Sequence, residues 1–586
     1  MVFIISILLL GYISTWILAY NFNLRRGLHL LQLEDYSPRR MLEVLQQRRG
    51  WFGSRLPMWI DLCFVAATLL FINSQSPKSI RFSFPSNILI ILLIAGLIAV
   101  NLYSVRLLRK KLKEAKKPLV ITARAKRILI VSGAFTILLM TILIISRLIL
   151  LTKFFLYHPR APEYQLNLLI ALLHTTILHV VVIKYIAGLI PIAALHILRP
   201  YEWLTQRRYL KQAQAILQEM KPLVIGITGS YGKTGTKEIL SALLAEKFNV
   251  FRPPGSYNTL MGVTRVVREG LRPYHEVFVV EMGAYRVGSI TKLCELTRPQ
   301  HGIITTIGVQ HLERFKTQET IKRAKSELIK ALPGGGIAVL NGDNQACREI
   351  GSEYGGEVIY FSVEGGGATP PYPLLPAGGE LKRGVRLTDI VISLSGSDFN
   401  VHFPDGKATP LHLPLLGRAA ISNAAAAIAL ADRLGVPRTA LKAALTRLPQ
   451  VCHRLELIRR SDGVIILDDA FNSNPIGAAC ALEVLSQAKT GRRILVTPGM
   501  VELGDLEAEA NYQFGRQAAL ACDLALLVGL KRIEPIRQGL LKEGFNAAMI
   551  WTAPTLQEGL DRLQSYLKPG DVLLLENDLP DQYAGA

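Results

Sequence analysis

Five long apolar runs fill the first third of this 586-residue chain, and no other feature constrains its fold as strongly. A helix needs about 17–25 apolar residues to cross the hydrocarbon core of a bilayer, so each run is long enough for a membrane span. Gly188 and Pro191 are expected to break the last run into a span and a short interfacial helix. We count five spans, with six as the alternative. The runs lie at about 2–20, 57–73, 87–104, 127–151 and 166–198.

The distribution of charge agrees with that count. Residues 1–199 carry +18 of the net charge of +22, so the remainder of the chain is nearly neutral. Basic residues gather in segments 21–56 and 105–127 and just after residue 198, whereas the loops between hold two each. This alternation is what five spans require when the N-terminus lies outside and residue 200 onward lies in the cytosol. The basic excess therefore indicates membrane topology and a lipid bilayer as partner, not nucleic acid.

Among the ionisable residues that interrupt the apolar runs, we single out four: Arg147, His174, His179 and Lys184. Such residues are costly in lipid and usually face a bundle interior or a cavity, where they could hold a phosphorylated lipid head group. The alternative is that they snorkel to the interface or form ordinary interhelical hydrogen bonds. Both readings stay open on the sequence.

From residue 221 onward, short Val/Ile-rich strands alternate with Ala/Leu-rich helices, which predicts a parallel α/β sheet. A Gly/Pro-rich stretch at 365–380 and alternating runs to about 415 suggest a small inserted β element. After a hinge near Leu448–Leu455, a second α/β set begins. Six cysteines without a CxxC pair argue against a disulfide framework. We divide the chain into a transmembrane region (1–199), a linker (200–221), a P-loop ATPase domain (222–448) and a C-terminal Rossmann-like α/β domain (449–586).

The strongest local motif joins a predicted strand to a predicted helix at residues 228–234. Glycines let backbone N–H groups turn toward a phosphate, and the helix N-terminus adds further donors. Lys233 is placed to neutralise the β/γ-phosphates of ATP, and the Thr234 hydroxyl to ligate Mg²⁺. Ile227 stands where the common P-loop pattern has glycine. The predicted ATP-binding residues here are Thr228, Gly229, Ser230, Gly232, Lys233 and Thr234.

The segment Gly226 to Lys237, GITGSYGKTGTK, resembles the ATP loop of the Mur ligases, and further motifs follow in that family's order. The octapeptide that begins at Asp468, DDAFNSNP, resembles the signature of the D-alanyl-D-alanine-adding (MurF-type) branch. Together the motifs cover about 222–505. The others are GSYN from Gly255, VEMGA from Val280, TRP from Thr297, HLE from His311, AKSE from Ala324, HRLE from His453 and MVELG from Met500.

This resemblance implies roles for individual residues, each with a structural alternative. Glu281 and His311 would complete Mg²⁺ coordination with Thr234, unless the buried carboxylate is only structural. Lys325 resembles the family's carbamylated lysine and Asn423 its adenine contact; otherwise they are a solvated and a packed helix residue. Arg454 and Asp469 would reach phosphate and ribose, or form an interdomain salt bridge. The resemblance thus makes Lys233, Lys325 and His311 the catalytic set, and Asn258, Asn472 and Asn474 substrate residues, although asparagines also suit turns.

The implied reaction is ATP-dependent amide formation in bacterial cell-wall synthesis, at the cytoplasmic membrane. A precursor carboxylate attacks the γ-phosphate to give an acyl phosphate, and the amine of an amino acid or dipeptide then displaces phosphate. Four departures stand out. Membrane spans replace the family's soluble UDP-sugar domain, and Gly235 replaces a hydroxyl residue. The segment Arg418–Ser422 before Asn423 lacks the usual His-Asn pair, and the chain ends in LENDLPD from Leu575 where a K-G-S-like segment is usual. The acceptor thus stays open between UDP-linked and lipid-linked. An ATP-binding membrane scaffold with a decayed ligase site is the alternative function.

Overall fold

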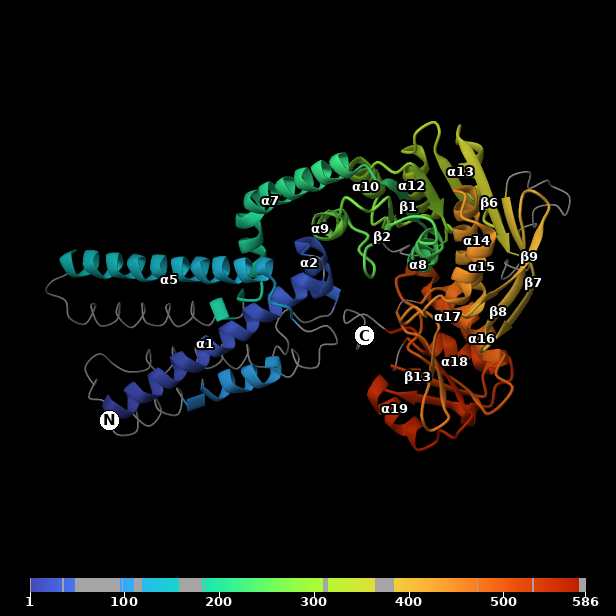
Figure 1. Ribbon diagram of the computed structural model, residues 1–586. Helices are drawn as coiled ribbons and strands as arrows, with labels where there is room; N and C mark the ends of the chain where they lie inside the picture. Colours follow the sequence, from blue (N-terminus) through green and yellow to red (C-terminus); the bar gives the residue numbers. More distant parts are fainter. Residues whose placement is uncertain are drawn as a thin grey trace. The chain divides into compact units, whose positions relative to one another are not determined.

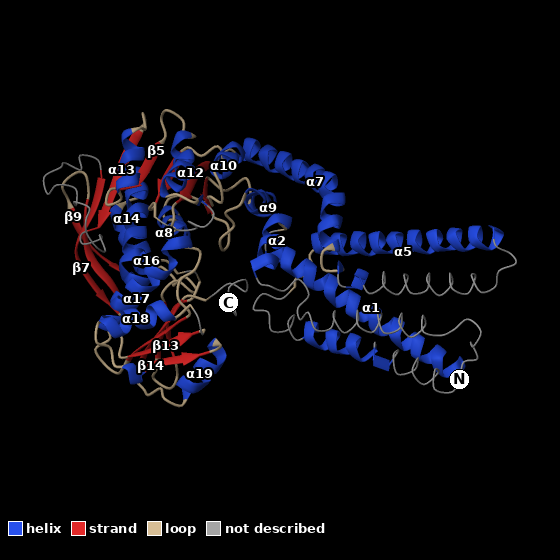
Figure 2. Cartoon of the chain, turned by 180° about the vertical axis from the view of Figure 1, so that it is seen from behind, coloured by secondary structure: helices blue, strands red, loops and turns tan. Residues whose placement is uncertain are grey.

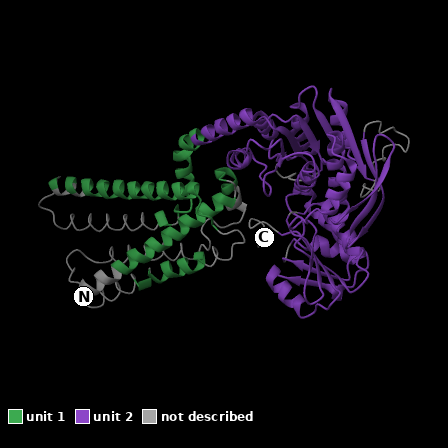
Figure 3. Cartoon of the chain, viewed as in Figure 1, with its two compact units in different colours: residues 1–204, 580–582 green, residues 205–579, 583–586 purple. Residues whose placement is uncertain are grey.

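Two compact units make up the chain in the computed structural model, residues 1–204 and residues 205–579 (Figure 3). The structure describes residues 2–33, 36–47, 95–96, 98–109, 119–157, 182–184, 186–308, 315–363, 384–471, 473–529 and 532–578.

The described part of the first unit is mainly helical, with short non-helical segments such as residues 119–122. Its helices include α1 (Val2–Leu33), α2 (Pro38–Gln47), α5 (Ala123–Tyr157) and the first half of α7 (Ile190–Met220), and residues 98–109 are helical as well. Helices α1 and α5 are joined by a hydrogen bond between Tyr20 Oη and Thr136 Oγ1 of 2.5 Å. Among the described residues, one stretch, Ala123–Leu150 in α5, is long and apolar enough to cross a membrane. The run at 57–73 and parts of the runs at 87–104 and 166–198 lie outside the described residues, so the five-span bundle remains a prediction.

Lys184 is the best defined of the four ionisable residues singled out in the apolar runs. Its side chain is 1% exposed, and its Nζ donates a hydrogen bond of 2.8 Å to Asn101 Oδ1. Asn101 in turn donates to Thr15 Oγ1 on α1 over 3.4 Å. Lys184 therefore forms an interhelical hydrogen bond, as in the alternative to a lipid head-group site that the sequence left open. Residues 174 and 179 lie outside the described part.

The segment that we assigned as a linker is helical. Residues 187–189 form a turn, so the predicted break near Gly188 is present, but α7 then continues unbroken from Ile190 to Met220. The stretch after Pro200 is rich in Gln, Leu, Ala and Lys, which favour a helix over a flexible connection. The second half of α7 packs Ala213 and Leu217 into the core of the following domain.

A nine-stranded sheet organises the middle domain, in the order β2-β3-β1-β4-β5-β6-β7-β8-β9 (Figures 1 and 2). The strands from β2 to β7 are parallel, as predicted, whereas β8 and β9 are antiparallel to their neighbours, so the sheet is mixed. Strands β7 to β9 fall in the stretch up to about residue 415 where a small β element was expected, and they extend the main sheet. The strands are β1 (Leu223–Thr228), β2 (Val250–Phe251), β3 (Val277–Glu281), β4 (His301–Ile304), β5 (Ile337–Asn341), β6 (Glu357–Val363), β7 (Gly384–Ser393), β8 (Gly396–His402) and β9 (Ala408–Leu413).

Helices cover both faces of this sheet, as its near-continuous buried strands require. One core joins strand residues such as Ile225 to α8 (Lys233–Leu244), α14 (Gly417–Arg433) and α15 (Arg438–Thr446). The opposite core, around Phe278, is formed with α9 (Leu260–Gly270), α10 (Ser289–Thr297), α12 (Gln318–Lys330) and α13 (Gln345–Ser352).

The C-terminal domain is a second α/β layer structure, with strand order β10-β11-β15-β12-β13-β14. Strand β10 is antiparallel to β11, and the other pairs are parallel. An ion pair of 2.9 Å between Arg418 on α14 and Glu483 on α16 links the two domains. The elements are β10 (Glu456–Arg459), β11 (Ile465–Asp469), α16 (Pro475–Ser486), β12 (Arg493–Thr497), α17 (Glu507–Ala521), β13 (Leu524–Val528), α18 (Glu534–Lys542), β14 (Ile550–Ala553), α19 (Leu556–Gln564) and β15 (Val572–Glu576).

Candidate active site

The phosphate loop runs from the carboxyl end of β1 to the start of α8. Gly232 has φ 79°, a conformation that favours glycine, and it caps α8. Lys233 folds back over the loop, and its Nζ donates to the carbonyl oxygens of Gly229 (2.8 Å) and Ser230 (3.3 Å). Burial lowers the pKa of Lys233, Glu281 opposes that shift, and the charge of Arg454 adds to it. A cation held in this way is poised to exchange carbonyl partners for phosphate oxygens.

Two of the predicted ATP-binding residues, Thr228 and Ser230, form side-chain hydrogen bonds to other parts of the protein. Thr228 Oγ1 donates to the Met282 carbonyl over 2.9 Å. Ser230 Oγ and Gly308 exchange hydrogen bonds of 2.9 and 3.0 Å, which fasten the phosphate loop to the segment after β4. The backbone N–H of Ser230 is also used within the protein, since it donates to the Thr306 carbonyl oxygen over 2.8 Å.

Glu281 is the last residue of β3, which lies beside β1, and its carboxylate accepts hydrogen bonds from one predicted metal ligand and one predicted substrate residue. Its Oε2 accepts a 2.8 Å hydrogen bond from Thr234 Oγ1, and its Oε1 accepts one of 2.8 Å from Asn258 Nδ2. Tyr285 Oη donates to Asn258 Oδ1 over 3.1 Å. A hydroxyl and a buried carboxylate are the hard oxygen donors that Mg²⁺ prefers, so these residues fit the ion. His311 lies outside the described residues.

Lys325 lies on α12 and is 5% exposed. Burial lowers the pKa of its amine well below the ordinary value, and the charge of Lys233 lowers it further. The two predicted catalytic lysines are therefore close enough to repel each other. A neutral amine is the form that reacts with CO₂, so the environment of Lys325 suits the carbamate that the resemblance implies.

Asn423, on α14, lies against the phosphate loop. Its Oδ1 accepts a hydrogen bond of 3.2 Å from Thr236 Oγ1 on α8. A Cβ atom on Gly235 would lie 2.5 Å from Asn423 Nδ2, closer than real contacts allow. The departure at Gly235 thus makes room for Asn423, whose contact with adenine remains a prediction.

This close approach predicts that Gly235→Ala will destabilise the protein by about 1–3 kcal/mol, because the added methyl overpacks the site. In an Asn423→Ala background, the same change should be neutral or stabilising by up to about 1 kcal/mol, as expected for glycine to alanine within a helix. Denaturant unfolding of the wild type, the two single variants and the double variant measures the coupling free energy between positions 235 and 423. Equal effects of Gly235→Ala in both backgrounds would contradict it.

Arg454 and Asp469 come from the C-terminal domain. The Arg454 guanidinium lies 4.3 Å from the centre of the Phe471 ring, and Asp469 Oδ1 accepts from the Leu455 N–H over 3.1 Å. Burial lowers the pKa of Arg454, while Asp469 and then Glu281 raise it. Carboxylates from both domains thus affect the pKa of Arg454, which agrees with its predicted position near the nucleotide.

The predicted substrate asparagines differ in their surroundings. Asn258 contacts Glu281, as described above. Asn474 caps α16, accepting a hydrogen bond of 2.8 Å from the Gly477 N–H, so it has the structural role that the sequence left open. Residue 472 lies outside the described part of the chain.

Sequence reasoning missed two residues near the site. Lys237 is fully buried, and its Nζ donates to the carbonyl oxygens of Pro253 (2.8 Å) and Gly255 (2.5 Å), fixing the loop that carries Asn258. Its place in the quoted ATP-loop motif was the available signal. Glu576, at the end of β15, is 1% exposed and lies beside Asp469. No local pattern marks it, because the neighbour is distant in sequence.

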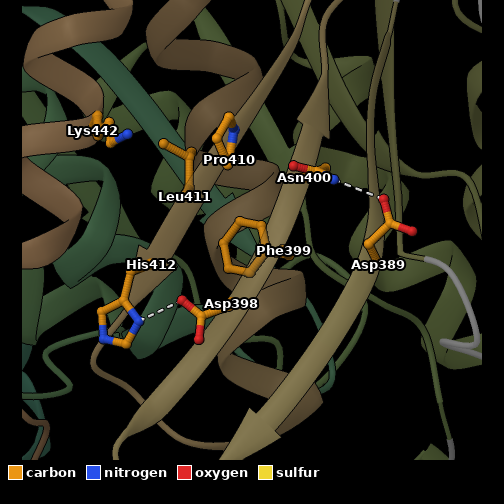
Figure 4. Close-up of a pocket in the computed structure, with 8 residues that line it drawn as sticks. All are labelled: Asp389, Asp398, Phe399, Asn400, Pro410, Leu411, His412 and Lys442. Carbon is orange, nitrogen blue, oxygen red and sulfur yellow. Dashed lines mark hydrogen bonds and ion pairs between the residues drawn. The ribbon is translucent and has the colours of Figure 1, made fainter.

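A separate pocket lies on the edge of the middle sheet, over β8, β9 and α15 (Figure 4). Strands β4 to β7 separate β8 from β1 in the sheet order. Four of its polar side chains form two pairs: His412 Nδ1 with Asp398 Oδ1, and Asn400 Nδ2 with Asp389 Oδ2, each at 2.8 Å. None of its lining residues belongs to the predicted site.

Comparison with known proteins agrees with this geometry. Residues 227–431 match the model of the Mur ligase middle domain, and residues 453–576 match that of the Mur ligase, glutamate ligase domain. The UDP-N-acetylmuramoyl-tripeptide–D-alanyl-D-alanine ligase of Mycobacterium tuberculosis H37Rv is 32% identical over 377 residues, which are 60% of this chain and 70% of that protein. The Escherichia coli K12 ligase of the same name is 32% identical over 327 residues, 56% and 68% of the two chains.

Solved structures give the same result. MurF from Acinetobacter baumannii matches with a TM-score of 0.55 and 26% identity, over 65% of this chain and 78% of that one. The MurF ligase from Thermotoga maritima in complex with ADP matches with a TM-score of 0.54 and 26% identity, over 64% and 80%. The chain therefore belongs to the Mur ligase family and is an ATP-dependent, amide-bond-forming ligase of MurF-like type.

Proposed function

We propose that this protein is a membrane-embedded ligase that joins D-alanyl-D-alanine, or a related amino donor, to the carboxylate of a bacterial cell-wall precursor. The observation that carries the proposal is the grouping of Lys233, the Thr234–Glu281 pair and Lys325 around one phosphate loop. The names of the relatives support the choice of donor. We retain the four-part division of the chain given above, with α7 as the connection between membrane and ligase parts.

The chemistry assigned to this chain is mostly positioning and charge stabilisation. Lys233 and the loop N–H groups would hold the β- and γ-phosphates, and Arg454 would approach them from the C-terminal domain. Thr234 and Glu281 would hold Mg²⁺, with His311 and carbamylated Lys325 as its further predicted ligands. Bound magnesium supplies charge neutralisation on the phosphate oxygens. The acceptor carboxylate then attacks the γ-phosphate, and the donor amine displaces phosphate from the acyl phosphate.

We further propose that the acceptor is lipid-linked and is held at the cytosolic face of the cytoplasmic membrane. The first 226 residues precede both matched family domains, and α5 exposes many apolar side chains, such as Ile137 and Leu156. Exposed apolar surface of this extent is typical of contact with lipid. The narrower alternative is that the helices only anchor the enzyme, which then uses a UDP-linked precursor. The scaffold alternative requires loss of activity despite the retained site residues.

Product analysis by mass spectrometry tests these alternatives. The full-length protein in nanodiscs receives ATP, Mg²⁺, D-alanyl-D-alanine and two competing acceptors, a UDP-linked and a lipid-linked muramyl tripeptide. We expect a dipeptide mass gain on the lipid-linked acceptor, absent with Lys233→Ala. A gain on the UDP-linked acceptor alone favours the anchor, and no gain on either contradicts the proposed ligase.

The membrane proposal has its own expected result. Alkaline carbonate removes peripheral proteins but not spanning ones, because a spanning helix keeps its apolar side chains in lipid. We expect the full-length protein to remain in the pellet after such a wash of expressing cells. Release into the supernatant would contradict membrane embedding without bearing on the ligase activity.

A further inference from the structure

Two carboxyl groups meet at the carboxyl edge of the C-terminal sheet, and the ligase mechanism above uses only one of them. Asp469 ends β11 and Glu576 ends β15, and the two residues are register partners in neighbouring parallel strands. Register partners in a parallel pair present their side chains on the same face of the sheet. Open α/β sheets bind ligands at this edge. The position therefore suits a substrate group.

Glu576 is buried with half of its carboxyl group unused. Its Oε1 accepts a short hydrogen bond from Ser473 Oγ. Its Oε2 is shielded from solvent and has no hydrogen-bond partner within the part of the chain that the structure describes. A buried polar oxygen without a hydrogen-bond partner is costly, so this oxygen suits a ligand that donates a hydrogen bond to it.

The Asp469–Glu576 pair has two carboxyl groups but, among the described residues, only one positive side chain to balance them. Arg454 balances Asp469, and His453 pairs with the adjacent Asp468 over 2.8 Å. On the β12 side, Asn577 Nδ2 donates a hydrogen bond to the Gly499 carbonyl oxygen. The Ser473 hydroxyl, which donates to Glu576, is neutral and adds no positive charge. Two neighbouring buried carboxylates facing one guanidinium cannot both stay ionised unless a further positive group arrives.

We propose that Glu576, paired with Asp469, is the proton-accepting site for the amine of the incoming donor. This inference rests on the proposed ligase function and adds a catalytic residue to it. The ligand class is a primary ammonium group, which supplies the missing charge and can donate to Glu576 Oε2. The charges of both Asp469 and Glu281 act on Arg454, and Glu281 is hydrogen-bonded to Thr234 at the end of the phosphate loop, so this site adjoins the place where the acyl phosphate forms.

The proton transfer follows from the low polarity of the site. Burial raises the pKa of Glu576 well above its ordinary value and the charge of Asp469 adds to this, while the Ser473 hydrogen bond opposes it. Burial also raises the pKa of Asp469 to about 6, against the effect of Arg454. An ammonium ion that binds displaces the resting proton of Glu576 to solvent. Inside the closed site, the neutral pair of amine and carboxylic acid is then favoured over the ion pair, since desolvation penalises charge.

The bonds balance in the step that follows. One ammonium proton moves to the Glu576 carboxylate, and the freed nitrogen lone pair attacks the acyl carbon. The C–N bond forms while the bond between that carbon and the phosphate oxygen breaks, and the leaving phosphate takes the bonding electrons. The remaining surplus proton on nitrogen passes to the phosphate. The reaction needs no oxidant, reductant or further co-reactant.

The test compares amines that differ in protonation. Hydroxylamine is a free base at neutral pH, whereas ammonium and D-alanyl-D-alanine arrive mainly protonated. The full-length protein in nanodiscs, with ATP, Mg²⁺ and both muramyl tripeptides, is assayed with each nucleophile. We expect Glu576→Gln to lower kcat with the two protonated amines by about 10²-fold, a usual contribution of a general base, while hydroxamate formation changes less than about threefold. The matched control Glu543→Gln, whose side chain pairs with Arg516 in the same domain, should alter neither reaction.

Hydroxamate formation also serves as the folding control for Glu576→Gln. A second measurement needs no variant: the rate of the wild type with protonated amines should fall toward acid pH more steeply than its rate with hydroxylamine. Identical pH profiles, or use of hydroxylamine but of neither protonated amine by the wild type, overturn the inference, as does unchanged ligation by Glu576→Gln. Failure of the wild type with all three nucleophiles instead contradicts the proposed ligase.

Discussion

Replacement of Lys233 by methionine should lower kcat for acceptor-dependent ADP formation by about 10³-fold or more, the scale on which preorganised charge stabilises a transition state. Methionine keeps most of the length of the side chain and removes its charge. The lysine amine lies within 2.8 Å of the Gly229 carbonyl, at the centre of the phosphate loop. Because the group acts on charge that develops at the γ-phosphate, the loss should fall on kcat more than on the KM for ATP.

The control for this experiment is Lys330→Met, which removes an exposed lysine from the last turn of α12. It should leave kcat unchanged. Steady-state ADP release and thermal unfolding are measured for both variants. If Lys233→Met keeps more than about a tenth of the wild-type kcat, a P-loop role for Lys233 is wrong, since one lost transition-state contact should cost more.

Local sequence was sufficient for the parts of the site that lie within one strand–loop–helix unit. The loop from Thr228 to Thr234 was predicted with its flanking strand and helix, because glycine placement and the change in hydrophobic period are both local signals. Glu281 was placed at a strand end for the same reason. The contact of Glu281 with Asn258 was not predicted, since nothing in either segment specifies the other.

Other features needed the three-dimensional arrangement. The alternating runs up to about residue 415 predicted a β element, but they do not specify that β8 and β9 join the main sheet antiparallel to their neighbours, because strand order and direction depend on contacts between distant segments. Residues 200–221 were assigned as a linker because composition changes there, yet their helix-forming residues extend α7. The Asp469–Glu576 pair joins two neighbouring strands that are far apart in the sequence, so the departure of the LENDLPD segment could be noted in the sequence but not explained from it.

Lys325→Met is expected to lower kcat by about 10²–10³-fold, because the position is predicted to provide a metal-bound oxygen rather than a cation. The basis is the contrast with Lys322 on the same helix. A hydrogen bond to Glu349 raises the pKa of Lys322, so its amine stays protonated and cannot take up CO₂. Burial lowers the pKa of Lys325 instead, and the charge of Lys233 strengthens the shift. The surroundings thus favour the ammonium form at Lys322 and the neutral amine at Lys325.

Removal of CO₂ separates a carbamate from a simple lysine contact. In degassed, CO₂-free buffer the wild type should lose most of its ADP-forming activity and regain it when bicarbonate is added. Acidification should slow that recovery, because protonation of the low-pKa amine blocks its reaction with CO₂. Lys325→Met should be inactive with or without bicarbonate, whereas Lys322→Met should respond like the wild type. Full wild-type activity without CO₂, together with an inactive Lys325→Met, would instead make the neutral amine itself the group that acts at this position.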